Sequence, residues 1–243
     1  MNIQSENKPY KQRQAMKVAH TLEPQYQNCI DLRNRQGLTT LGLMSNQVWH
    51  DDPRRLTFLL SRYKFVAKML SGLEHVLEIG CADAFGTRVV LQEVKKVTAI
   101  DFDPAFVEDV KSRMEADWEI DVRLHDILVE PVGELFDGAY ALDVLEHIPR
   151  ESEQRFLANI AASLTHCGVL IIGTPSVESQ NYASAPSKAG HKNCKDYFSL
   201  KNLLSSFFYN VFVFSMNDEV IHTGFYPMAS YLIALCCYKQ KTC

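Results

Sequence analysis

The sequence predicts a doubly wound α/β domain whose sheet is mostly parallel. Apolar runs of strand length alternate with helical stretches from His75 onwards, and such alternation is typical of a parallel sheet covered by helices on both faces. The chain has 243 residues, of which 47% are hydrophobic and 22% charged. This length and composition suit one α/β domain with an accessory segment.

An N-terminal helical segment precedes the alternating part. We predict an N-terminal arm and candidate active-site lid over residues 1–52, on position alone, and the main domain over residues 53–243. Pro53 follows two aspartates and marks a helix start. Apolar residues then recur at helical spacing as far as Leu70, and Gly72 ends the helix.

The alternating part contains seven predicted strands, at 75–79, 97–101, 120–126, 136–145, 169–175, 210–215 and 229–238. Helices are predicted at 86–94, 104–115, 151–164 and 199–208, the last with Ser199 as its N-cap. Cys167 and Gly168 are predicted to turn into the fifth strand. The polar stretch 176–197 is predicted as a long loop, and loops of that length are often functional.

The composition argues against several classes of protein. A net charge of −4 and a pI of about 6.1 lack the basic excess typical of nucleic-acid binding. Seven cysteines without paired spacing indicate reduced, mostly buried thiols rather than disulfides or a zinc site. The N-terminus has no apolar signal region, and the longest apolar run is too short to span a bilayer as a helix. We therefore expect a cytoplasmic protein without a membrane span.

The turn after the first predicted strand has the features of a nucleotide-like ligand site. Gly80 permits a sharp turn, and the small residues Ala82 and Gly86 leave the backbone open to a ligand. Asp101 ends the second strand 21 positions after Gly80, a spacing that suits a carboxylate accepting hydrogen bonds from ribose hydroxyls. Asp83 puts a negative charge where a pyrophosphate would sit, which disfavours a dinucleotide.

Five motifs in order give the chain a resemblance to class I S-adenosylmethionine-dependent methyltransferases. They are VLEIGCADAFG, VTAIDFDP, LHDI, FDGAYALDVLEHIP and HCGVLIIGTPS, within residues 73–176. The departures are Ala82 and Ala84, where glycine is common, and Cys167 before Gly168. Alanine adds only a methyl group, so we expect these substitutions to be tolerated. The resemblance implies a seven-stranded, doubly wound sheet with an antiparallel last strand.

The resemblance also implies a cofactor and its site. The cofactor would be S-adenosyl-L-methionine, with S-adenosyl-L-homocysteine as product. Glu78 and Asp83 would supply negative potential to its positive groups, backbone N–H groups of the turn would bind its carboxylate, and Asp126 would accept from the adenine amine. The cofactor-binding residues are predicted to be Glu78, Gly80, Cys81, Ala82, Asp83, Gly86, Asp101, Phe102, Asp126, Ile127, Asp143 and Val144.

The acceptor side has fewer signals. His191, in the long loop, is the strongest candidate for a catalytic base, and His147, just after the fourth strand, is the second. Asp218, Glu219 and His222 resemble metal ligands, but such a cluster is more often a polar hairpin tip, and no metal site is predicted. The expected acceptor is a small molecule methylated on oxygen or nitrogen, such as a sugar or secondary metabolite, rather than a nucleic acid.

Two alternatives remain at this point. The chain is either catalytic or a binding protein that keeps the cofactor fold without turnover, although its intact acidic residues argue against the second case. An NAD-dependent oxidoreductase would use the same ribose carboxylate. The missing G-x-G-x-x-G pattern and the charge of Asp83 weigh against that class.

Overall fold

The computed structural model describes residues 20–114 and 118–240. The chain divides into two compact units after Thr40. In the smaller unit, the short helix η1 (Pro24–Tyr26) leads into α1 (Gln27–Gln36), which ends where Gly37 adopts a positive φ of 81°. The first nineteen residues of the predicted arm lie outside the described part of the chain.

The larger unit contains an eight-stranded sheet in the order β3-β2-β1-β4-β5-β8-β6-β7. The strands from β3 to β5 are parallel, and β8 runs antiparallel to both of its neighbours. Their bounds are β1 (His75–Ile79), β2 (Lys96–Asp101), β3 (Asp121–Leu124), β4 (Phe136–Leu142), β5 (Leu164–Pro175), β6 (Phe208–Asn217), β7 (Val220–His222) and β8 (Tyr231–Lys239). The predicted fold class is confirmed. The short hairpin strand β7 is an addition, since its residues were expected only to connect two strands.

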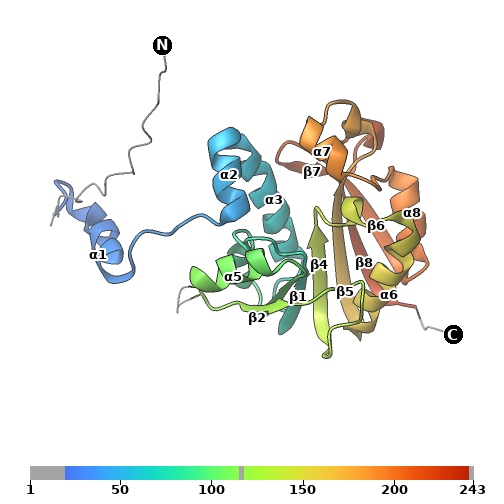
Figure 1. Ribbon diagram of the computed structural model, residues 1–243, viewed down its shortest axis with the longest axis horizontal. Coiled ribbons are helices and arrows are strands. Elements are labelled where there is room, and N and C mark those ends of the chain that lie inside the picture. The colour runs from blue at the N-terminus through green and yellow to red at the C-terminus, as the bar shows by residue number, and fades with distance from the viewer. Residues whose placement is uncertain (1–19, 115–117, 241–243) are drawn as a thin grey trace, which may run out of the picture. The chain divides into compact units, whose positions relative to one another are not determined.

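Helices cover both faces of the sheet (Figure 1). On one face lie α3 (Arg54–Met69), α4 (Thr87–Leu91) and α5 (Pro104–Ser112), and on the other lie α6 (Glu153–Ala162) and α8 (Tyr197–Ser205). The predicted apolar stripe of α3 buries Leu56, Tyr63 and Val66. Strands such as β4 are therefore covered by helices on both faces and are almost wholly buried. This burial explains why the sequences of these strands are continuously apolar.

The helix α2 (Leu43–Asp51) belongs to the larger unit, although the sequence analysis grouped it with the arm. The carboxylate of Asp83 accepts hydrogen bonds from the backbone N–H of Ser45 at 2.6 Å and from its Oγ at 3.3 Å. These bonds satisfy donors in the first turn of α2, which otherwise lack partners within the helix. The larger unit accordingly begins at Leu41.

Three local predictions are wrong in detail. Cys167 and Gly168 lie within β5 rather than in a turn before it, at a bulge where the register shifts opposite β4. Asp196, not Ser199, caps α8, because its carboxylate accepts from the backbone N–H of Ser199 at 2.8 Å. The stretch predicted as one loop contains the helical segments η5 (Glu178–Asn181) and α7 (Ala185–Gly190).

The cysteines agree only partly with their prediction. The described ones are all free, but Cys29 and Cys167 are exposed and only Cys81 and Cys236 are buried. None of the described helices is long and apolar enough to cross a membrane.

Candidate active site

A pocket of about 510 Å³ opens beyond the carboxyl ends of the parallel strands β1 to β4. The strand order reverses between β1 and β4, and ligands of open α/β sheets bind at such switch points. Many of the predicted site residues line this pocket, namely Gly80, Ala82, Asp101, Phe102, Asp126, Ile127, Asp143, Val144 and His147.

Asp101 is held in a fixed orientation at the floor of this pocket. One carboxylate oxygen accepts from the backbone N–H of Ala82 and the other from that of Asp103, both at 2.9 Å. A carboxylate offers about four lone-pair positions, so two of them stay available to a ligand. This is the geometry expected of a carboxylate that binds ribose hydroxyls.

The wall next to Asp101 is apolar. The Phe102 side chain is 73% exposed and borders the pocket together with Ile127 and Phe106. Asp126 lies at the same wall, where one oxygen accepts from the backbone N–H of Leu128 at 2.8 Å. An apolar slot with a carboxylate at its edge suits a flat ring that carries an amino group.

The backbone of the first turn is already hydrogen-bonded. The N–H groups of Gly80 and Cys81 both donate to the carbonyl of Ile100, at 2.9 and 3.1 Å, and the N–H of Ala82 donates to Asp101. The expectation that these N–H groups bind the cofactor's carboxylate is therefore wrong for all three. Gly80 has a φ of +69°, and an added Cβ would lie 2.6 Å from the Val144 side chain, so the turn requires glycine here.

Glu78 lies beneath the turn rather than in the pocket wall. It is 2% exposed and accepts hydrogen bonds from the Tyr63 hydroxyl at 2.8 Å and from the Thr87 hydroxyl. Burial raises the pKa of Glu78 to about 7, against the opposing effect of these two donors. The prediction that Glu78 lies beside the cofactor's positive charges is therefore wrong. Its hydrogen bonds instead join β1 to α3 and α4.

Three more predicted cofactor contacts are also structural. Asp83 is 5% exposed and faces α2, not the pocket. Cys81 is buried, and that burial raises the pKa of its thiol. Gly86 is needed for packing, because an added Cβ would lie 2.3 Å from the ring of Tyr63.

Asp143 directly follows β4 and lies in the wall of the same pocket. It has a φ of +56°, which is unusual for a residue with a side chain. Its carboxylate accepts from Arg62 at 2.7 and 2.9 Å, and the guanidinium carbon of Arg62 lies 3.7 Å from the ring centroid of Tyr231. Neither Arg62 nor Tyr231 was predicted as a site residue, since one lies in an amphipathic helix and the other in a buried strand.

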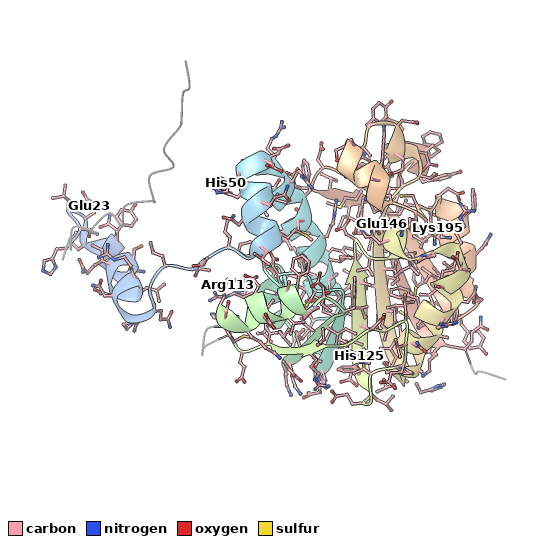
Figure 2. The ribbon with its side chains drawn as sticks, viewed as in Figure 1. Glu23, His50, Arg113, His125, Glu146 and Lys195 are labelled. Carbon is pink, nitrogen blue, oxygen red and sulfur yellow. The ribbon has the colours of Figure 1, made fainter. Side chains whose placement is uncertain are left out.

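Glu146, labelled in Figure 2, follows in the helical turn η3 (Leu145–His147). Its side chain is buried, at 1% exposed. Its Oε2 accepts from the Thr174 hydroxyl at 3.2 Å, whereas its Oε1 accepts from no described residue. Burial, with a contribution from the negative charge of Asp143, raises the pKa of Glu146 to about 8.

The two predicted catalytic histidines lie next to each other. The ring centroids of His147 and His191 are 5.4 Å apart. His147 is in the pocket wall, but His191 lines a second pocket of about 320 Å³ together with Arg62, Gln180 and Tyr231. Burial, followed by the neighbouring His147, lowers the pKa of His191, which favours its neutral form.

The hairpin cluster considered as a metal site is not assembled. His222 bonds through Nε2 to the Asn217 side chain at 3.0 Å, and Glu219 accepts from the Thr57 hydroxyl at 2.6 Å.

Known proteins share this fold and part of this sequence. A family model described as a methyltransferase domain matches residues 76–168. No curated protein sequence matches the chain. The solved N-methyltransferase NodS from Bradyrhizobium japonicum WM9 is 20% identical with a TM-score of 0.56, over 78% of this chain and 99% of that one. NodS in complex with S-adenosyl-L-homocysteine is 21% identical with a TM-score of 0.57, over 77% and 89% of the two chains. The DhpI–SAH complex is 12% identical with a TM-score of 0.59, over 81% and 92%.

The sheet order and the pocket at its switch point define a class I methyltransferase fold. Residues 76–168 form a methyltransferase domain. The comparisons therefore show the fold of class I methyltransferases for this chain and a methyltransferase-domain sequence over residues 76–168.

Proposed function

We propose that the protein transfers a methyl group from S-adenosylmethionine to an oxygen or nitrogen atom of a small-molecule acceptor, such as a sugar or secondary metabolite, in the cytoplasm. The observation that carries this proposal is a pair of adjoining pockets. Arg62 in the wall of the second pocket bonds to Asp143 in the wall of the first, and His191 of the second contacts His147 of the first.

The first pocket fits a nucleoside-bearing cofactor. The free lone pairs of Asp101 would accept from the ribose hydroxyls, Phe102 and Ile127 would enclose the adenine ring, and Asp126 would accept from its amino group. The bound cofactor supplies a methyl group already activated on a sulfonium. The protein's contribution is then mainly to align the acceptor and exclude water.

The second pocket supports a small acceptor. Its volume of about 320 Å³ lies at the lower end of small-molecule sites. Arg62 and Tyr231 offer polar groups there, and His191 and His147 stand between the two pockets, where an acceptor would lose its proton. The net charge of −4 supports a small molecule over a nucleic acid.

Calorimetric titration tests the cofactor site. S-adenosylhomocysteine should bind the purified protein and NAD should not. Asp101→Asn should weaken binding of S-adenosylhomocysteine by about 1–3 kcal/mol, or roughly 5- to 150-fold, through lost charge-assisted hydrogen bonds. Asp137→Asn is the matched control, because Asp137 bonds to the backbone of His75 at the opposite end of β1. Unchanged affinity in Asp101→Asn would remove this residue from the site.

A screen of sugars, phenols and amines for release of S-adenosylhomocysteine tests the acceptor. His191→Ala should lower turnover far more than cofactor affinity. Cofactor binding without release from any acceptor would favour the non-catalytic alternative. Thermal protection by NAD but not by S-adenosylhomocysteine would favour an oxidoreductase.

A further inference from the structure

Three side chains with metal-binding atoms converge between the two pockets. Glu146, His147 and His191 each offer one ligand atom, and these atoms lie within 4.8 Å of one another. The first two come from η3, directly after β4, and the third follows α7. No other group of this kind occurs among the residues that the structure describes.

Glu146 provides an independent sign that something is bound there. Its Oε1 is buried and takes no hydrogen bond from any described side chain or backbone group, although it lies 4.0 Å from His147 Nε2. A buried polar atom without a partner costs about 1–3 kcal/mol. A cation between Glu146 and the histidines would remove that cost.

Both histidines are oriented as metal ligands usually are. Nδ1 of His147 lies 3.0 Å from the carbonyl oxygen of Gly190, and Nδ1 of His191 lies 2.9 Å from Oε1 of Gln180. Oxygen acceptors require a hydrogen on each Nδ1, so in the neutral rings Nε2 carries the lone pair. Metal-binding histidines typically donate their other ring N–H to a carbonyl oxygen or carboxylate in this way.

The amide of Gln180 is itself fixed. Its Nε2 donates to the carbonyl of Ser176 and to the hydroxyl of Ser179, both at 3.3 Å, so its oxygen faces His191. Ligand atoms bound at about 2.0–2.2 Å to one ion lie about 3.0–3.5 Å apart. A side-chain movement of roughly 1 Å would therefore bring the ligand atoms of Glu146, His147 and His191 to the separations that one bound ion requires.

We propose that Glu146, His147 and His191 bind a divalent first-row transition-metal ion that holds the acceptor's oxygen. One carboxylate and two imidazoles suit Zn²⁺, Mn²⁺ or Fe²⁺ better than Mg²⁺ or Ca²⁺, which prefer oxygen ligands alone. Three protein ligands leave coordination positions open. Because His147 lines the first pocket and His191 the second, a bound ion would lie where the two pockets adjoin.

The inference rests on the proposed function and specifies its acceptor as a hydroxyl compound. The ion lowers the pKa of the bound hydroxyl, whose proton passes to water. The oxygen's electron pair then forms the O–CH₃ bond while the S–CH₃ bond breaks, and that bond's electron pair remains on sulfur as the thioether.

The test uses the full-length protein, freed of metal by chelation and dialysis and saturated with S-adenosylhomocysteine. Calorimetric titration should find one Zn²⁺ or Mn²⁺ bound per chain, and tighter binding than Mg²⁺. Glu146→Gln and His191→Asn should each weaken binding at least tenfold, and Gln180→Ala about 10- to 100-fold. His166→Asn, at an exposed position in β5, is the control and should bind normally.

Cobalt(II) provides a second readout if one variant folds poorly. Its visible spectrum reports nitrogen ligands, and the spectrum of the wild type should change in His147→Asn and His191→Asn but not in His166→Asn. Binding of S-adenosylhomocysteine without any Zn²⁺ or Mn²⁺ would overturn the metal site and leave the proposed function intact. Full turnover of a hydroxyl acceptor after chelation would overturn the role of the ion. Absence of S-adenosylhomocysteine binding would instead contradict the proposed function.

Discussion

Two buried glutamates flank the pocket, and their surroundings differ. Glu78, at β1, accepts hydrogen bonds on both oxygens, from Tyr63 and Thr87. Glu146, after β4, leaves one oxygen without a donor among the described residues. Both are almost fully buried, at 2% and 1% exposed. The difference separates a carboxylate that holds helices and strand together from the one that we propose as a metal ligand.

A similar contrast holds between the two pockets, which are called the cofactor side (the first pocket) and the acceptor side (the second pocket) after their proposed functions. The cofactor side, at β1 and β2, is built by backbone hydrogen bonds around Gly80 and Asp101. The acceptor side is built by side chains distant in sequence, such as Arg62, Tyr231 and His191. Mutations on the cofactor side should lower stability and cofactor affinity together. Mutations on the acceptor side should lower turnover but leave cofactor affinity nearly unchanged.

Gly80→Ala should have the largest effect. A Cβ at this positive φ is strained and would lie 2.6 Å from Val144, so we expect a loss of about 2–4 kcal/mol in the free energy of unfolding and of at least tenfold in S-adenosylhomocysteine affinity. Gly72→Ala is the control, since it has a positive φ of 85° but no atom within 4 Å. It should lose only about 1–2 kcal/mol. Equal losses in urea unfolding would contradict the clash with Val144.

Glu78→Gln should change how stability depends on pH. Burial raises the pKa of Glu78 from 4.5 to about 7, so the folded state holds this proton more tightly than the unfolded chain. The wild type therefore loses stability as pH rises from about 5 to 8, by about 3 kcal/mol at most. Glutamine does not ionise, so the variant should gain relative to the wild type over that range.

Urea unfolding at several pH values measures this difference. Glu93→Gln is the control, because Glu93 is paired with Lys68 and hydrogen bonds lower its pKa. That variant should not gain on the wild type as pH rises. A constant difference between Glu78→Gln and the wild type would show that Glu78 is ionised throughout.

Arg62→Met should lower turnover without a comparable loss of cofactor affinity. It leaves Asp143 without its main partner in a half-buried position, and we expect a loss of about 2 kcal/mol in stability. Turnover should fall at least tenfold, because Arg62 lines the second pocket. S-adenosylhomocysteine affinity should change less than threefold. Arg54→Ala, which breaks a pair exposed to solvent, should leave stability nearly unchanged. A joint collapse of affinity and turnover in Arg62→Met would contradict the division into two sides.

The position of the first pocket could be predicted from the sequence, because the residues at its strand ends are local. Gly80 and Ala82 follow β1 and Asp101 ends β2, and parallel strands bring such ends to one edge. The interpretation of Asp83 failed because its partner Ser45 is 38 positions away. A sequence pattern gives the charge of a side chain but not the direction in which it points.

The acceptor side could be predicted only in part for the same reason. His147 and His191 were both expected near the site, but nothing in the sequence indicated that their rings touch. Their contact depends on η5 and α7, which fold a stretch that was predicted as loop. Arg62 occupies a helix whose periodicity indicates packing, so its bond to Asp143 had no local signal.

The substitutions Ala82→Gly and Ala84→Gly should have the smallest effect, and they test the left-handed backbone of the first turn. Both alanines adopt a left-handed backbone, with φ of 47° and 51°. Glycine would relieve about 1–2 kcal/mol of strain at each position but would lose about 0.4–1 kcal/mol through a more flexible unfolded chain. We expect a net gain of about 1 kcal/mol or less in the free energy of unfolding for each substitution. Cofactor affinity should stay nearly unchanged, because the N–H of Ala82 keeps its bond to Asp101.

Ala158→Gly is the control, because it should lower the free energy of unfolding in the same experiment. Ala158 is exposed in the middle of α6, where glycine costs about 1 kcal/mol. A loss of similar size in the Ala82 and Ala84 variants would mean that the turn does not hold its left-handed backbone in solution. A large gain in cofactor affinity would mean that the two methyl groups obstruct the ligand, and that the cofactor side is less complete than its hydrogen bonds indicate.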